Sequence, residues 1–383
     1  MSKLMKVVWI CGLPEEVRLN GCHEIISDFK CATWSWIMGH LPPPDNVELH
    51  VICPTMGLKK ETLEFCYKGV EWHCVRQRRH EMLFLWRRVL GAVKPIVRTI
   101  SPDVIHGWGG ENGFAYMATL LSKRAFVSVQ GQLAFYDDAV PVCSSHIWSL
   151  GVFLERRLRR WIERYSYRHA FACVTESVLS KESLRKYYGV DSYVVHHPLR
   201  AEFLDSVLDD RCELLKSPAS FLFLGSLENR KGAWDAYLAL KKANVGGGRI
   251  LFVGDGPLKN KLASLVEVRS DVSARDIVHL MREFQFYILP SYCDTGPTSL
   301  KEAMSQGLYP ICYDNSGPKE LLGQYGSGSV VPTGDVCALA RSISNAVANM
   351  SECLERSMVV AEAVRNDLNP KRIWQILTSL YQG

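Results

Sequence analysis

The chain has 383 residues and a net charge of +5, with 47% hydrophobic and 22% charged residues, a balance typical of a globular protein of two or three domains. Its thirteen cysteines are an odd number and form no CxxC pair, which argues against a disulfide framework and against a structural zinc site. No apolar run approaches the roughly 20 residues of a membrane-spanning helix, and the short apolar run near the N-terminus indicates a buried strand rather than a signal peptide. We therefore expect a protein of the reducing cytoplasm.

Short apolar runs rich in β-branched and aromatic residues alternate along the chain with segments of helical periodicity. In chain order we expect strands at 6–10, 47–53, 70–75, 104–106, 125–129, 172–175, 193–196, 220–224, 250–253, 286–289, 308–312 and 328–331. We expect helices at 113–121, 148–169, 233–242, 259–266, 276–284 and 336–348, and a last helix at 370–381. This alternation indicates the α/β class, with parallel sheets covered by helices on both faces.

A dozen strands favour two doubly wound, Rossmann-like sheets of about six strands each over one large sheet. Pro198 stops one strand, and a polar stretch precedes the next apolar strand, so a boundary near residue 200 is predicted. The predicted domains are 1–200 and 201–365, followed by a helical tail at 366–383. Because doubly wound sheets bind ligands at the carboxyl ends of their strands, we expect the site in a cleft between the domains.

The positive charge is concentrated in the first domain. Residues 1–200 hold 26 Lys and Arg against 19 Asp and Glu, whereas residues 201–383 hold 19 against 21. The predicted helix at 153–169 has seven basic side chains interleaved with Phe, Leu, Trp and Tyr. It suits an anionic membrane surface, and it suits equally well a helix with one face in the core and a basic face in solvent.

Two glycine-containing motifs follow predicted strands of the second domain. In FLGSLENRKG, Gly225 permits a tight turn, and Arg230 and Lys231 precede a helix, where adjacent cations suit a diphosphate. In FVGDGP, Gly254 and Gly256 let the backbone approach a ligand closely. Each motif alone is also compatible with an ordinary surface turn.

A third motif, PSYCDTGPTSLKEAM at 290–304, runs from a strand into a helix. We expect Pro297 at the first helical position with Thr295 or Gly296 as N-cap, so that the first N–H groups of the helix form an anion site. Asp294 lies in the loop before this helix, and Glu302 lies inside it. Favourable interaction with the helix dipole explains an acid at 294 but not one at 302. A fourth motif, YDNSGPKE, follows the next strand.

With these four motifs the chain resembles the retaining glycosyltransferases of family 4, which have the GT-B fold. The order and spacing of the motifs agree over roughly residues 220–350, whereas the first half matches in little more than its strand–helix rhythm. The residues that carry the resemblance are Gly225-Ser226-Leu227, Lys231-Gly232, Val253-Gly254-Asp255-Gly256-Pro257, Pro290-Ser291, Asp294, Gly296, Glu302-Ala303-Met304-Ser305-Gln306-Gly307, Pro310 and Gly317.

The resemblance implies an acceptor-binding first domain, a second domain that binds a nucleotide sugar, and a last helix that packs back on the first domain. It implies that Lys231 and Arg230 hold the donor diphosphate, that Glu302 binds the ribose and that Asp294 binds the donor sugar. Further implied donor contacts are Gly12, Gly225, Gly254, Gly256, Thr295, Gly296, Pro297 and Thr298. No cofactor and no metal is implied, because cationic side chains and a helix end take the role of a divalent ion.

The sequence departs from the family pattern at three positions. Asp294 stands where the family usually has Glu, Ser226 stands where Arg is usual, and Gln130 stands where a histidine often follows a strand of the first domain. Candidate acceptor contacts are His106, Trp108, Glu111 and Gln130, and His106 is also a candidate for catalysis. A lone histidine at a strand end is, however, more often a hydrogen-bonded structural residue.

The predicted function is metal-independent transfer of a hexose, with retained configuration, to a saccharide or lipid-linked saccharide in cell-surface polysaccharide or lipopolysaccharide synthesis. Peripheral binding to the inner face of the cytoplasmic membrane would accompany it. The three departures leave open a catalytically weak relative that binds a sugar nucleotide or scaffolds a glycan-assembly complex. A nucleic-acid partner is disfavoured because no recognition motif is present, and a dehydrogenase because no G-x-G-x-x-G follows the first strand.

Overall fold

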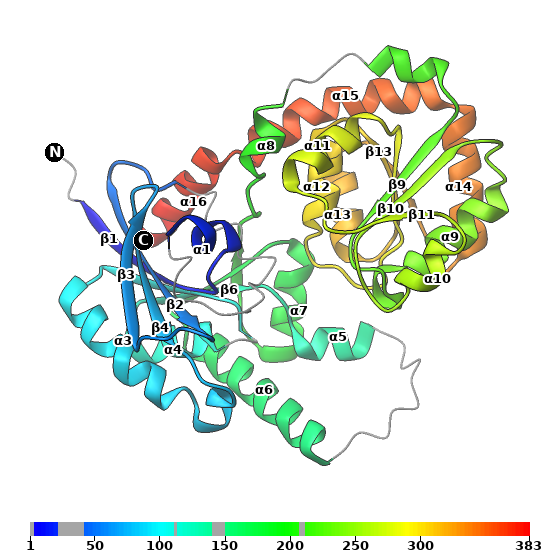
Figure 1. Cartoon of the computed structure of the whole chain (residues 1–383). Helices are drawn as coiled ribbons and strands as arrows, with labels where there is room; N and C mark the ends of the chain where they lie inside the picture. Colours follow the sequence, from blue (N-terminus) through cyan, green and yellow to red (C-terminus); the bar gives the residue numbers. More distant parts are fainter. Residues whose placement is uncertain (1–3, 22–41, 111–112, 140–149, 207–210) are drawn as a thin grey trace. The chain divides into compact units, whose positions relative to one another are not determined.

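The structure is a computed structural model that describes residues 4–21, 42–110, 113–139, 150–206 and 211–383 (Figure 1). The chain divides into two compact units, one of Met1–Pro198 with Pro370–Gly383 and the other of Leu199–Asn369. The chain passes between the units at Pro198–Leu199 and at Asn369–Pro370, close to the boundaries predicted near 200 and 365.

The first unit contains an eight-stranded sheet in the order β3-β4-β2-β1-β5-β6-β7-β8. Its strands are β1 (Met5–Ile10), β2 (Val47–Thr55), β3 (Thr62–Tyr67), β4 (Val70–Arg76), β5 (Val104–Trp108), β6 (Ala125–Val129), β7 (Ala172–Thr175) and β8 (Ser192–Val194). All neighbours pair in parallel except β3 and β4, which form an antiparallel pair. The prediction of about six strands was wrong here, partly because β3 was missed: its exposure alternates along the strand, as expected of an edge strand.

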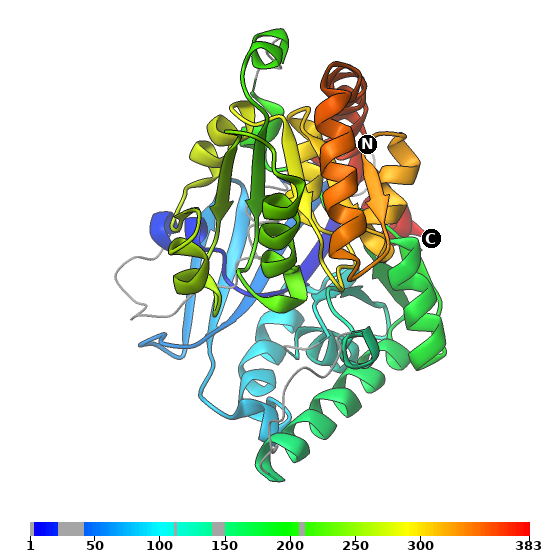
Figure 2. The same cartoon turned by 90° about the vertical axis from the view of Figure 1, so that its right-hand side faces the viewer.

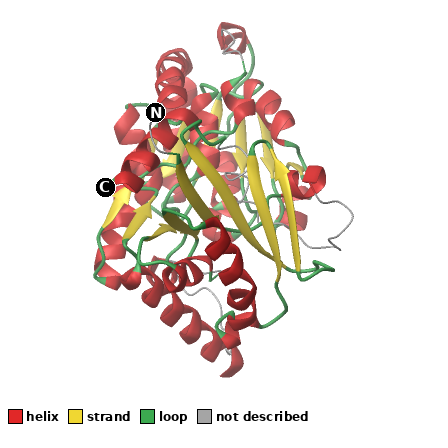
Figure 3. Cartoon of the chain, turned by 90° about the vertical axis from the view of Figure 1, so that its left-hand side faces the viewer, coloured by secondary structure: helices red, strands yellow, loops and turns green. Residues whose placement is uncertain are grey.

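Helices and 3₁₀ turns connect the strands of the first unit. They are α1 (Glu15–Gly21), η2 (Glu81–Phe84), α3 (Arg87–Ile100), α4 (Phe114–Leu121), α5 (Leu133–Ala139), α6 (Leu150–His169), α7 (Val178–Tyr188) and the C-terminal α16 (Pro370–Gln382). The strands of the sheet (yellow) run side by side with helices (red) packed along them (Figure 3).

The second unit contains a six-stranded, all-parallel sheet in the order β11-β10-β9-β12-β13-β14. The strands are β9 (Ser220–Leu224), β10 (Arg249–Val253), β11 (Glu267–Arg269), β12 (Phe286–Leu289), β13 (Tyr309–Tyr313) and β14 (Ser329–Val331). The helices are α8 (Ala201–Leu204), η3 (Arg211–Lys216), η4 (Asn229–Lys231), α9 (Ala233–Ala243), α10 (Lys259–Ala263), α11 (Ala274–Arg282), α12 (Thr298–Ser305), α13 (Ser316–Tyr325), α14 (Val336–Ala348) and α15 (Met350–Asp367). Figure 2 shows the green-to-yellow strands with the orange helices α14 and α15 beside them.

Burial on both faces explains why the predicted strands of the second sheet are nearly continuous apolar runs. Every residue of β12 and β13 is buried. Separate apolar clusters cover the two faces: Leu222 and Leu289 belong to one, and Phe221 and Phe286 belong to the other. Such a sheet requires helices on both sides.

The strand order of the second sheet reverses between β9 and β12. From β9 the chain builds outward through β10 and β11, and then returns to add β12, β13 and β14 on the other side. The loops that follow β9 and β12 therefore lie at the carboxyl edge where the strand order reverses, which is the position at which doubly wound sheets bind ligands. Both loops carry motifs that the sequence singled out.

The C-terminal helix α16 packs within the first unit. Ile373, Trp374, Leu377 and Tyr381 are buried in the core cluster of the first sheet, and the Trp374 ring stacks on Trp9 with centroids 5.0 Å apart. The hydroxyl of Tyr381 lies 2.5 Å from Nδ1 of His106 and accepts a hydrogen bond from Nε1 of Trp9 at 3.2 Å. Burial lowers the pKa of His106 to about 3, so the ring is neutral and accepts from Tyr381.

Removal of this hydroxyl is expected to destabilise the first unit. Tyr381→Phe leaves Nδ1 of a fully buried imidazole without its partner, which costs about 1–3 kcal/mol of unfolding free energy. Urea unfolding measures the loss, and Tyr193→Phe is the control because the Tyr193 side chain is 54% exposed. Equal stability of the two variants would contradict the assigned role of Tyr381.

Candidate functional site

The candidate site in the second unit is built by two loops that are joined at the point where the strand order reverses. The loop after β9 ends in η4, and the loop after β12 leads into α12. The backbone N–H of Tyr292 donates to the carbonyl of Arg230 at 2.8 Å, and Nη1 of Arg230 donates to the carbonyl of Cys293 at 3.3 Å. The two loops are thus held together by one backbone–backbone hydrogen bond and one hydrogen bond from a side chain to the backbone.

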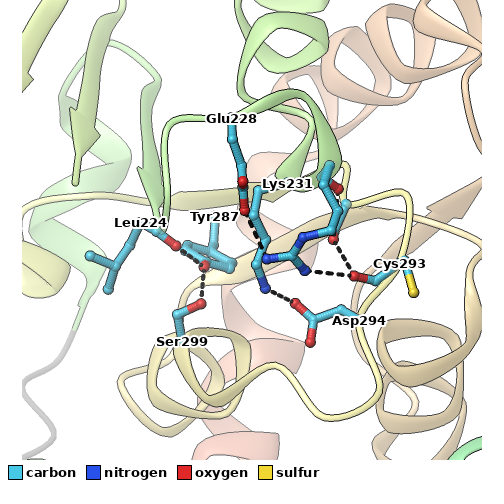
Figure 4. Close-up of polar contacts among 9 residues, drawn as sticks. Leu224, Glu228, Lys231, Tyr287, Cys293, Asp294 and Ser299 are labelled. Carbon is cyan, nitrogen blue, oxygen red and sulfur yellow. Dashed lines mark hydrogen bonds and ion pairs between the residues drawn. The ribbon is translucent and has the colours of Figure 1, made fainter. Parts of the chain in front are cut away.

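An ion pair between Lys231 and Asp294 completes this junction (Figure 4). Both side chains are largely buried, with 21% of Lys231 and 11% of Asp294 exposed, so the pair is shielded from bulk solvent. The guanidinium of Arg230 lies 2.8 Å from Glu228. The structure therefore brings Lys231, Arg230 and Asp294 together as the sequence suggested, and it adds Glu228 as a partner of Arg230.

Close backbone approach explains two of the glycines. Gly232 has a φ of +69°, and a Cβ atom there would lie 1.8 Å from the carbonyl oxygen of Pro290. Gly254 has a φ of +150°, and its Cβ would lie 2.0 Å from the carbonyl oxygen of Gly225. Both values are far inside van der Waals contact, so the loops can meet only where a side chain is absent.

The fourth motif reaches the same place. The N–H of Gly317, in the first turn of α13, donates to the carbonyl of Asp294 at 3.1 Å. Gly225 donates to Val253 at 3.0 Å, and Leu227 donates to Asp255 at 2.8 Å, which joins the first motif to the second. Four loops from the neighbouring strands β10, β9, β12 and β13 therefore form one surface.

Helix α12 begins one residue later than predicted. Pro297 is its N-cap, not its first helical residue, and the Pro297 side chain makes no capping hydrogen bond. The Tyr287 hydroxyl links the first turn of α12 to the end of β9, since it lies 2.7 Å from Oγ of Ser299 and 3.0 Å from the carbonyl of Leu224 (Figure 4). The first N–H groups of the helix lack intrahelical acceptors, so the anion site expected there stays a prediction.

Glu302 lies on the fifth residue of α12 and is only 2% exposed. Burial raises the pKa of its carboxyl group, and the charge of Arg200 opposes this shift. Nε and Nη2 of Arg200 lie 2.8 and 2.7 Å from Oε1 of Glu302. Sequence reasoning missed Arg200, which is 102 residues away in the chain and belongs to none of the motifs.

The candidate residues of the first unit are distributed differently. Gly12 follows β1 and is half-buried, and Glu111 lies outside the described residues. His106 is fully buried on β5, with Nε2 2.9 Å from Oγ of Ser128 and Nδ1 on Tyr381. Both ring nitrogens thus hydrogen-bond to buried residues of the same unit, as expected of a histidine with a structural role. This geometry does not support contact of His106 with an acceptor.

A polar cluster at the carboxyl edge of the first sheet contains two residues that the sequence did not point to. Nε2 of Gln130 lies 3.2 Å from Nε2 of His197, and Nδ1 of His197 lies 3.2 Å from Glu176. Trp108 is 3% exposed, and its ring centroid lies 6.2 Å from that of His197. An imidazole therefore lies beside Gln130, although it comes from the segment after β8 and not from position 130.

The described residues contain no group of three or more His, Cys, Asp and Glu side chains arranged to hold a metal ion. No helix of the described part of the chain is long and apolar enough to cross a membrane.

Comparison with known families follows the two units. Residues 44–198 match the model described as glycosyl transferase 4-like domain, and residues 210–365 match the model described as glycosyl transferases group 1. Together the two models cover most of the chain. The chain belongs to the group 1 glycosyltransferases, and the predicted resemblance is confirmed.

Two curated proteins are similar in sequence. A putative colanic acid biosynthesis glycosyltransferase of Salmonella typhimurium is 27% identical over 43% of this chain and 45% of its own length. A 2-deoxystreptamine N-acetyl-D-glucosaminyltransferase of Streptomyces fradiae is 25% identical over 68% of this chain and 66% of its own length. The chain thus spans between about half and two thirds of these relatives.

Solved structures resemble the chain over nearly its whole length. A sucrose-phosphate synthase of Thermosynechococcus elongatus has a TM-score of 0.76 at 15% identity and covers 99% of this chain and 98% of its own. The HepE protein of Anabaena in complex with UDP-glucose has a TM-score of 0.68 at 12% identity, with 99% of both chains covered. WaaG, a glycosyltransferase involved in lipopolysaccharide biosynthesis, has a TM-score of 0.67 at 13% identity, with 97% of this chain and 99% of its own covered. The predicted GT-B fold class is confirmed.

The close approach at Gly232 leads to a prediction about folding of the second unit. Gly232→Ala is expected to destabilise it by more than about 2 kcal/mol, because the added methyl group overlaps the Pro290 carbonyl and the positive φ is unfavourable. The control is Gly323→Ala in α13, where a Cβ meets no atom within 4 Å and the change is expected to be neutral or stabilising. Chemical denaturation measures both, and a neutral Gly232→Ala would contradict the packing described.

Proposed function

We propose that this protein is a retaining, metal-independent glycosyltransferase that moves a hexose from a nucleoside diphosphate sugar to a saccharide or lipid-linked saccharide. The observation that carries the proposal is the Lys231–Asp294 pair at the reversal of the second sheet, beside the start of α12. An ammonium group and free backbone N–H groups suit a diphosphate, and an adjacent carboxylate suits sugar hydroxyls. Membership of the group 1 glycosyltransferases also supports the proposed transfer of a sugar.

The reaction that fits these groups breaks the bond between C1 of the sugar and the oxygen of the β-phosphate. The electron pair remains on the departing diphosphate, and the acceptor oxygen forms its bond to C1 on the same face. The proton of the acceptor hydroxyl passes to an oxygen of the departing diphosphate. Lys231, Arg230 and the first N–H groups of α12 would stabilise the negative charge that develops there, and no separate base is required.

Donor binding would redistribute the partners of Lys231 and Asp294. In the absence of donor the two neutralise one another. In the proposed complex, the ammonium group turns to the diphosphate, and the carboxylate accepts hydrogen bonds from sugar hydroxyls. The buried Glu302 carboxylate would receive the ribose hydroxyls.

A role in cell-surface polysaccharide or lipopolysaccharide synthesis is supported by the relatives, one named for colanic acid biosynthesis and one structural neighbour for lipopolysaccharide biosynthesis. A nucleotide sugar as donor is supported by the neighbour that was solved with UDP-glucose. Synthesis of this kind would place the protein in the cytoplasm, at the inner face of the cytoplasmic membrane.

The alternative is a catalytically weak relative that binds a sugar nucleotide without turnover. The observation that favours it is the shorter carboxylate at position 294, which already has a partner in Lys231. The alternative predicts donor binding without release of nucleoside diphosphate.

Release of nucleoside diphosphate tests the proposed reaction. With UDP-, GDP- and ADP-hexoses and water as the acceptor, one donor is expected to be hydrolysed slowly, and proton NMR should first show the sugar with the configuration of the donor. Asp294→Ala is expected to reduce the rate by at least about tenfold, because a charge-assisted hydrogen bond is lost, and Asp294→Glu should reduce it less.

Asp276→Ala, which removes an exposed carboxylate of the same unit, should leave the rate of release unchanged. Binding without release would support the catalytically weak alternative. First appearance of the opposite anomer would contradict retention.

Membrane contact is proposed through the exposed face of α6. Phe153, Arg157, Arg160, Trp161 and Arg164 follow one another at helical spacing and are all exposed. Phe153 and Trp161 are 50% and 48% exposed, although aromatic side chains are normally buried. Arginines with exposed aromatic rings between them suit a surface of anionic lipid. The opposite face of α6 lies in the core, where Ile162 is buried, as the core-facing interpretation of this segment expects.

Vesicle binding tests this surface. The protein is expected to sediment with vesicles that contain phosphatidylglycerol and not with vesicles of phosphatidylcholine alone. Trp161→Glu should weaken binding about tenfold, because it removes apolar area and adds like charge. Val359→Glu, on the 77% exposed Val359 of α15, should not. An equal loss of vesicle binding in the two variants, or equal binding of the wild type to both kinds of vesicle, would contradict the proposed membrane contact through α6.

A further inference from the structure

The most buried carboxylate of the candidate donor site has a counter-ion from outside the motifs. Arg200 is the second residue of the second unit and precedes α8, whereas Glu302 lies in α12. Side-chain exposure is 16% for Arg200 and 3% for Glu302. An ion pair this well shielded has stronger electrostatic coupling than a surface pair.

The contact with Arg200 uses only one oxygen of the carboxylate. Nε and Nη2 of Arg200 both lie on Oε1 of Glu302, at 2.8 and 2.7 Å. Within the described part of the chain, Oε2 of Glu302 accepts no hydrogen bond. Carboxylate oxygens in protein interiors normally have a donor, so Oε2 is the atom that remains for a ligand.

The charge state of Glu302 depends on Arg200. Burial raises the pKa of the Glu302 carboxyl group, the charge of Glu202 in α8 raises it further, and the charges of Arg200 and Lys301 lower it. The Tyr287 hydroxyl of β12 also faces this region. Of the two cations, Arg200 has the larger effect and is the one that hydrogen-bonds to the carboxylate. Without Arg200 the carboxyl group would protonate at higher pH.

We propose that Arg200 is a positioning residue of the donor site, which holds Oε1 of Glu302 so that Oε2 is available to the ribose hydroxyls of a ribonucleoside diphosphate. The inference rests on the proposed function and deepens it, because it adds a residue that acts through Glu302 without touching the donor. It also makes the selection of ribose over sugars without 2′ and 3′ hydroxyls depend on Arg200.

The experiment is calorimetric titration of the full chain with UDP, GDP and ADP and with their 2′,3′-dideoxy counterparts. In the wild type, one ribonucleoside diphosphate is expected to bind at least about tenfold more tightly than its dideoxy form, as expected for hydrogen bonds to a charged acceptor. Arg200→Met and Glu302→Gln should each reduce the ratio of the two affinities toward one, because each weakens binding of the ribose form and leaves binding of the dideoxy form unchanged. Arg200→Lys should retain part of it.

The dependence of affinity on pH separates positioning from a purely structural role. As the pH is lowered, protonation of Glu302 should weaken binding of the ribose form. In Arg200→Met this weakening should begin at a higher pH than in the wild type, because loss of the Arg200 charge raises the pKa of Glu302 further. Arg365→Met is the control, since Arg365 also supports α12, through the carbonyl of Ser305 at 2.8 Å, but does not contact Glu302. It should leave both the ratio and the pH profile unchanged.

The outcomes distinguish this inference from the proposed function. If Glu302→Gln reduces the ribose-to-dideoxy ratio and folded Arg200→Lys and Arg200→Met do not, Arg200 is not a positioning residue and the donor site stands. If the wild type binds no nucleoside diphosphate, or binds the dideoxy form equally well, the proposed ribose site fails and this inference fails with it. If Arg365→Met lowers the ratio as much as Arg200→Met, the effect is structural and the inference is overturned.

Discussion

The ion pair between Lys231 and Asp294 is the interaction on which the candidate site depends. It joins the loops that follow β9 and β12, the two strands between which the order of the second sheet reverses. The loops could not meet without Gly232, whose missing side chain leaves room for the Pro290 carbonyl. In the proposed function, an ammonium and a carboxylate held this way are preorganised for a ligand with negative charge at one end and hydroxyl groups at the other.

The second constraint is the cost of burying Glu302. A carboxylate that is 2% exposed would normally lose its charge, and the guanidinium of Arg200 opposes this. The fold places the two charges together although they are far apart in the chain. Lys231 and Asp294 are also largely buried, and their opposite charges neutralise one another. A ligand that binds one of these side chains must therefore displace the other from it.

Features with a local physical cause could be predicted from the sequence. The strands of the second sheet are apolar runs because both faces are buried, and the motif glycines mark positions where backbones meet. The antiparallel β3 was missed because half of its residues are exposed, so its sequence is not a continuous apolar run. The N-cap at Pro297 was missed by one residue, and the hydrogen bond from Tyr287 of the preceding strand to Ser299 of α12 was not predicted because it depends on tertiary packing. The burial of His106 by α16, and the partners Arg200 and His197, depend on contacts between distant segments, which one sequence without relatives does not reveal.

The measurement that tests the central claim most directly is calorimetric titration of UDP, GDP and ADP into the wild type and Lys231→Ala, in EDTA and then in magnesium. If cationic side chains and the start of α12 bind the diphosphate, one nucleotide will bind with the same Kd in both buffers. Lys231→Ala will weaken it by about tenfold or more, the value of a charged hydrogen bond. Binding that requires magnesium, or that is unchanged in Lys231→Ala, would contradict the account.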